Sequence, residues 1–154
     1  TFMKTKKNGI SFKSKYGWVS IEQENKKITS VSFGKTKNIG YSKKLINLKK
    51  LINGYFLKRN KKIKVDISLS GSKIQNQIWN ELKKISYGET KSYGEIAKKL
   101  KTSPRYVGKV CGQNKHLIIV PCHRVIRSDK KLGGFSGTGG IKMKQRLLNL
   151  EKSI

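Results

Sequence analysis

The chain has 154 residues, 35% of them hydrophobic, and is long enough to bury one or two small cores without disulfide support. Its two cysteines, Cys111 and Cys122, are too few for a disulfide framework and favour a reducing, cytoplasmic setting. No apolar run approaches the length of a membrane span and no signal peptide is visible, so we expect no membrane association.

The formal net charge is +28, from 36 Lys and Arg against 8 Asp and Glu. Such an excess favours a polyanionic partner, nucleic acid first. The charge is spread rather than focused, because residues 1–70 carry +15 and residues 71–154 carry +13. Lys, Asn and Ile are all abundant, so a biased base composition in a generally basic protein remains an alternative explanation.

The first part of the chain, residues 1–69, has the pattern of a small α/β unit. Residues 1–9 are polar and basic, and we expect no regular structure there. Hydrophobic periodicity predicts a strand over 16–23, a strand over 28–33, a helix over 43–57 and a strand over 61–69. This part contains no cysteine or histidine, and we find no candidate site in it.

The second part, residues 70–154, begins with a helical pattern over 74–85 and contains two closely spaced helix starts. Ser92 followed by Glu95 is a capping box that opens a helix ending near residue 100. Ser103 and Pro104 supply the cap and first position of another helix, which we expect to end at Gly112. Two helices joined by a short turn predict a helix-turn-helix.

The second helix of this pair has two contrasting sides. The side expected to pack carries Val107, Val110, Cys111 and Asn114, so we interpret Cys111 as a core residue. The side expected to face solvent carries Arg105, Gly108, Lys109 and Gly112. Glycines there would let a nucleic-acid backbone approach, with Arg105 projecting into it. A solvated basic face is the alternative.

A possible reactive centre follows. The apolar run 117–120 predicts a buried strand that Pro121 ends, and Cys122 and His123 come next. A thiol beside an imidazole at a strand end is a candidate nucleophile. An ordinary buried cysteine next to a surface histidine is the alternative. Further along, five glycines between Gly133 and Gly140 predict a pliant loop able to lie against a ligand, and a last helix is expected over 141–151.

Several motifs together carry a family resemblance. They are Pro121-Cys122-His123-Arg124-Val125, the segment 86–97 with Ser92-Tyr93-Gly94-Glu95, Asn114, Gly133-Gly134-Phe135-Ser136, and Lys144, Leu147, Leu148 and Glu151. Over about residues 43–151 the chain resembles the O6-alkylguanine-DNA alkyltransferases, or methylated-DNA–protein-cysteine methyltransferases. The resemblance implies an α+β fold class, with a ribonuclease-H-like α/β domain over 1–69 and a winged helix-turn-helix domain over 70–154.

The resemblance also implies a function, which is single-turnover repair of O6-alkylguanine, and of O4-alkylthymine, in double-stranded DNA. The protein would act as a monomer without a cofactor or metal, at the nucleoid or, in a eukaryote, in the nucleus. It would bind the minor groove and flip the damaged base. By resemblance, Cys122 accepts the alkyl group, His123 acts through a water with Glu151 to activate the thiol, and Asn114 holds the turn. Base and DNA contacts would come from Tyr93, Arg105, Val125, Ser136, Gly108 and Lys109.

Some features depart from the family pattern, and other functions remain possible. Some relatives carry an Asn-Pro-x-Pro run before the signature, where this chain has Asn114-Lys115-His116-Leu117. Some relatives also bind a structural zinc in the N-terminal half, but residues 1–69 of this chain contain no Cys or His to bind one. The alternatives are a protein that binds alkylated guanine without transfer, a helix-turn-helix regulator, or a thiol hydrolase that turns over. A zinc site from Cys111, His116, Cys122 and His123 matches no common spacing.

Overall fold

The computed structural model describes residues 6–134 and 139–152, and the chain divides into two compact units between Leu69 and Ser70. Unit 1 is a mixed α/β unit and unit 2 is mainly helical. The expected fold class is therefore confirmed. Among the described residues, no helix is both long enough and apolar enough to span a membrane.

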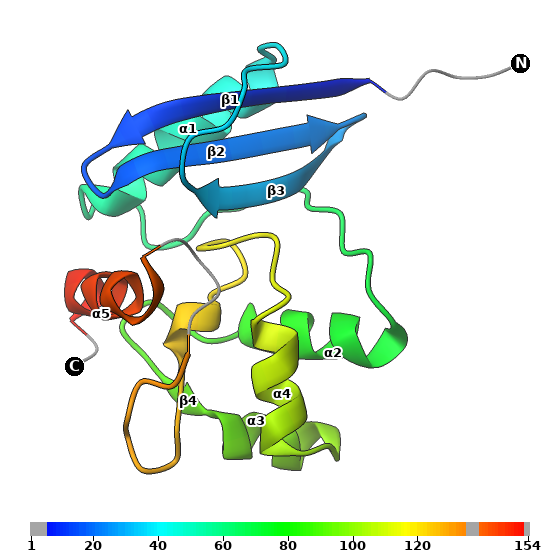
Figure 1. Cartoon of the computed structure of the whole chain (residues 1–154), viewed down its shortest axis with the longest axis vertical. Coiled ribbons are helices and arrows are strands. Elements are labelled where there is room, and N and C mark those ends of the chain that lie inside the picture. The colour runs from blue at the N-terminus through cyan, green and yellow to red at the C-terminus, as the bar shows by residue number, and fades with distance from the viewer. Residues whose placement is uncertain (1–5, 135–138, 153–154) are drawn as a thin grey trace, which may run out of the picture. The chain divides into compact units, whose positions relative to one another are not determined.

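Unit 1 is an antiparallel sheet in the order β1-β2-β3, with α1 packed on it (Figure 1). The bounds are β1 Lys7–Ser14, β2 Gly17–Glu24, β3 Lys27–Phe33 and α1 Lys43–Phe56. Ile10 pairs with Ile21, and both are buried together with Leu48 and Ile52 of α1. The apolar stripe of the helix thus closes the core over one face of the sheet.

Two expectations for unit 1 were wrong. Residues 7–9 belong to β1, because backbone pairing with β2 orders them despite their polar side chains. Within the described range 6–134, residues 61–69 form no regular strand and join the sheet only through a bridge between Ile28 and Ile67. That bridge uses hydrogen bonds from Ile28 to the Asp66 carbonyl and from Ser68 to the Ile28 carbonyl. The alternation of apolar residues predicted a strand, but a single bridge to β3 is too little backbone pairing to form one.

Unit 2 contains the expected helix-turn-helix. The elements of unit 2 are α2 Lys73–Leu82, β4 Lys91–Ser92, α3 Tyr93–Leu100, α4 Pro104–Cys111, the 3-10 helix η1 Cys122–Arg124, β5 Val125–Ile126 and α5 Gly140–Glu151, of which α3 and α4 form the helix-turn-helix. Ser92 and Glu95 form the predicted capping box at α3, and Ser103 caps α4 with Pro104 in its first turn. The short strands β4 and β5 pair in parallel and join the start of α3 to the end of η1.

The buried strand expected over 117–120 is absent from this fully described stretch, and a tight turn stands in its place. Ile118 has a φ of 73°, a left-handed conformation that no strand contains. The Val120 amide donates to the His116 carbonyl, which closes the turn. Burial was correctly predicted, since Leu117 and Val120 are buried, but a short apolar run does not by itself distinguish a strand from a buried turn.

Candidate active site

The turn that carries Cys122 is held by the buried side chain of Asn114. Its amide nitrogen donates to the Val120 carbonyl at 2.8 Å, and its amide oxygen accepts from the His116 backbone at 2.9 Å. The Cys122 amide in turn donates to the Val120 carbonyl at 2.8 Å. Asn114 therefore connects the end of α4 to the residue before Pro121 and fixes where the thiol lies.

His123 is fully buried, which excludes the reading of it as a surface residue. Its Nε2 lies 2.8 Å from Oε2 of Glu151, whose side chain is also fully buried. Arg124 binds the same carboxylate through Nε and Nη2, at 2.8 and 2.9 Å, and donates from Nη1 to the Ile85 carbonyl. One carboxylate of α5 thus joins two consecutive residues of η1.

The protonation states follow from burial and from these partners. Burial raises the pKa of the Cys122 thiol, while a hydrogen bond with Asn114 and the charge of Lys144 oppose the rise. Burial lowers the pKa of His123, with Glu151 opposing that shift, so the imidazole is neutral near pH 7. Burial alone would raise the pKa of Glu151, but hydrogen bonds from His123 and Arg124 outweigh it and the net shift is downward. At neutral pH the site therefore contains a protonated thiol on Cys122, a neutral imidazole on His123 and a carboxylate on Glu151.

Tyr93 is the first residue of α3, and its ring lies near two glycines, Gly108 and Gly133. A Cβ on Gly108 would stand 3.9 Å from its ring, and one on Gly133 would stand 3.0 Å from it. Burial raises the pKa of the Tyr93 hydroxyl, which accepts a hydrogen bond from Lys144 Nζ at 3.3 Å. The hydroxyl therefore stays protonated at neutral pH and is available as a donor. Gly108, which we had expected to face a nucleic acid, is half-buried beside this ring.

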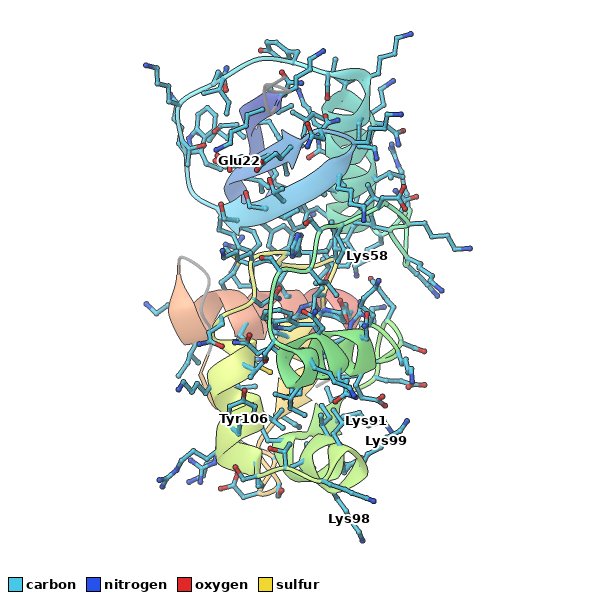
Figure 2. The ribbon with its side chains drawn as sticks, turned by 90° about the vertical axis from the view of Figure 1, so that its right-hand side faces the viewer. Glu22, Lys58, Lys91, Lys98, Lys99 and Tyr106 are labelled. Atoms are coloured by element: carbon cyan, nitrogen blue, oxygen red, sulfur yellow. The ribbon has the colours of Figure 1, made fainter. Side chains whose placement is uncertain are left out.

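The exposed side of α4 agrees with the predicted pattern at Arg105 and Lys109, both of which face solvent. On α3, Figure 2 shows Lys98 extending away from the ribbon. Val125 is fully buried, and its carbonyl already accepts from Lys144 at 2.7 Å. Ser136, the other residue expected to contact a base through its backbone, lies outside the described residues.

Two residues of this site were not assigned a role from the sequence. Arg124 follows directly on the Cys-His pair, so its position in the motif was a usable signal. Lys144 was already among the motif residues, but its role was harder to predict because it lies on the packed side of α5 with Leu148 and Glu151, at helical spacing. A lysine on the apolar face of a helix is the signal that could have indicated a buried cation.

Metal ligation was one of the alternatives from sequence. Across residues 6–134 and 139–152, the structure contains no group of three or more His, Cys, Asp or Glu side chains placed to hold a metal ion. Cys111, which is buried on the packed side of α4, has a pKa raised to about 12, first by burial. In the described part of the chain, Cys111, His116, Cys122 and His123, the residues of the zinc alternative, therefore form no such group.

Comparison with known proteins supports the resemblance. Residues 73–153 match the family model described as "6-O-methylguanine DNA methyltransferase, DNA binding domain". A methylated-DNA–protein-cysteine methyltransferase of Mycobacterium bovis is 45% identical over 104 residues, which are 66% of this chain but only 62% of the relative. The Metallosphaera sedula protein of that name is 31% identical over 147 residues, covering 94% of this chain and 92% of the relative.

The fold is also similar to solved structures. The Mycobacterium tuberculosis OGT in complex with DNA superposes with a TM-score of 0.83 at 33% identity, covering 94% of this chain and 92% of that one. The M. tuberculosis O6-methylguanine methyltransferase gives a TM-score of 0.80 at 32% identity, covering 96% and 94% of the two chains. The signature residues, the site geometry and a likeness over most of the chain agree: the chain belongs to the family of methylated-DNA–protein-cysteine methyltransferases.

Proposed function

We propose that this chain repairs alkylated DNA by transferring the alkyl group from O6 of guanine, and from O4 of thymine, to Cys122 in a single turnover. The observation that carries the proposal is the buried thiol of Cys122 followed by His123, whose Nε2 is 2.8 Å from Glu151. This arrangement lies in the same unit as a helix-turn-helix with exposed cations on α4. The pair alone would suit several thiol chemistries, and the DNA-binding element favours this one.

The chemistry needs a soft nucleophile and a base, because the target carbon is saturated. Neutral His123 takes the thiol proton through a water, and Glu151 stabilises the resulting imidazolium. The Cys122 sulfur then bonds to the alkyl carbon while the carbon–oxygen bond breaks and its electron pair stays on guanine. Tyr93, kept protonated by burial, donates a proton to the leaving base. The thioether product has no easy leaving path, so each molecule reacts once.

Access to the thiol requires the base to leave the DNA stack. Cys122 is only 4% exposed, so a lesion held inside a duplex cannot reach it. Flipping the nucleotide costs on the order of a few kcal/mol. Arg105, at the start of α4, fills the gap left in the duplex, while Gly108 and Lys109 approach the backbone from the minor groove. The base then contacts backbone groups of Val125 and Ser136. The protein does this as a monomer.

Intact mass spectrometry after incubation with a duplex carrying one O6-methylguanine tests the proposal. We expect a gain of one methyl group per protein, limited to one and absent from Cys122→Ala. Cys111→Ala is the matched control and should still be methylated. Tight lesion binding without a mass change would indicate a damage-sensing protein instead. No mass change and no preference for the lesion would refute the assignment altogether.

A further inference from the structure

Lys144 is a buried lysine whose hydrogen-bond partners include Tyr93 and Val125, two residues that we propose contact the damaged base. The residue has no exposed surface. Its Nζ donates to the carbonyls of Val125 at 2.7 Å and Gly134 at 3.1 Å, to that of Leu132, and to the Tyr93 hydroxyl at 3.3 Å. One ammonium group of α5 thus ties together β5, the glycine-rich segment and the start of α3.

This cation has no carboxylate partner among residues 6–134 and 139–152, where none of the ion pairs includes Lys144. Burial lowers its pKa to about 8, so it is still mostly charged near pH 7. The titratable groups that interact with its charge are the thiols of Cys111 and Cys122 and the His123 imidazole, and the Tyr93 hydroxyl accepts its hydrogen bond. A buried charge without a counterion is costly, so the absence of an acid needs a physical reason.

We propose that Lys144 is a positioning residue whose charge is the counterion of the Cys122 thiolate. When the thiol proton passes to His123, the signs alternate along the site, from Lys144 to Cys122, His123, Glu151 and Arg124. Each anion then lies between two cations, which lowers the cost of separating charge inside the protein. The relevance of the thiolate to repair rests on the proposed function, but the electrostatic pairing is a property of this chain alone.

The pairing also explains why, among the residues that the structure describes, three carbonyls and no carboxylate hold the ammonium group. A carboxylate beside Lys144 would neutralise the cation and oppose ionisation of the thiol, whereas carbonyl dipoles orient the cation and leave its charge available. The same bonds hold the Leu132–Gly134 segment and Tyr93 to one another through the ammonium group. Of the two thiols, Cys122 is the one followed directly in the chain by a histidine, His123, which we propose takes its proton.

A DNA-free reaction tests the proposal separately from repair. Iodoacetamide alkylates a thiolate by forming a sulfur–carbon bond as iodide leaves, and peptide mass mapping distinguishes Cys122 from Cys111. For Lys144→Met we expect the Cys122 rate at pH 7 to fall about tenfold, with its pH profile displaced upward by about one unit. Lys142→Met removes the same charge from the exposed side of α5 and should leave the rate unchanged. Equal rates in a folded Lys144→Met variant would overturn the proposal.

A second measurement holds even where Lys144→Met does not fold. The pKa of Lys144 is read from its ¹⁵Nζ shift in the wild-type protein, where the buried thiol stays protonated while the lysine titrates, and in Cys122→Asp, which places a permanent anion at that position. We expect a higher Lys144 pKa in the aspartate variant, because an anion at position 122 favours the charged lysine. A purely structural tie would leave the pKa unchanged, and that result would refute the counterion role. Neither measurement involves DNA, so a failure of methyl transfer would not be confused with either outcome.

Discussion

Replacing Glu151 by Gln should destabilise unit 2 strongly. The carboxylate is fully buried and accepts one hydrogen bond from His123 and two from Arg124. Glutamine keeps one acceptor oxygen but turns an NH₂ group toward donors, and it leaves a nearly buried guanidinium without its counterion. Removing one partner of such a pair costs about 3–5 kcal/mol, a large part of the ~5–15 kcal/mol that holds a domain folded.

Urea unfolding measures this loss, and Trp79 reports on unit 2 because its indole donates to the Val110 carbonyl. A Trp18→Phe background removes the signal of unit 1. Glu95→Gln is the control, because its pair with Lys91 is more than half exposed and should be worth less than about 1 kcal/mol. If both glutamine variants unfolded at the same urea concentration, Glu151 would not be the buried counterion that its geometry indicates.

Three further predictions concern the same site. Gly133→Ala should lose about 1–2 kcal/mol in urea unfolding, because its φ is 73° and its Cβ would meet Tyr93 at 3.0 Å, while Gly134→Ala, with nothing within 4 Å, should change little. Because the folded pKa of Glu151 lies below the unfolded one, its stabilisation is fully present above about pH 5 and is lost as the pH falls further. The wild-type protein should therefore lose stability more steeply than Glu151→Gln below about pH 5, and parallel curves would contradict this. Asn114→Ala should cost about 1–3 kcal/mol and speed amide hydrogen exchange in the turn that follows, and unchanged exchange would mean that the turn holds itself.

The local structure of the helix-turn-helix was readable from sequence because its signals act over a few residues. Ser92 with Glu95, and Ser103 with Pro104, satisfy or replace backbone donors within one helical turn. The packed and exposed sides of α4 follow from helical spacing in the same way. The stretch 117–120 shows the limit, because its burial was evident but its left-handed residue Ile118 carries no signal in an apolar run.

The candidate site likewise has residues that the sequence indicated and contacts that only the tertiary structure revealed. From the sequence alone, residue chemistry and resemblance together indicated Cys122 and His123 as site residues, and resemblance indicated Glu151. Only the tertiary structure decided that Arg124 shares the carboxylate and that Lys144 is buried with no acidic partner in the described part of the chain. The physical reason is distance along the chain: the partners of Glu151 lie 27 and 28 residues away, and Lys144 reaches Tyr93 across 51. Contacts of that span depend on how helices pack, which local spacing does not encode.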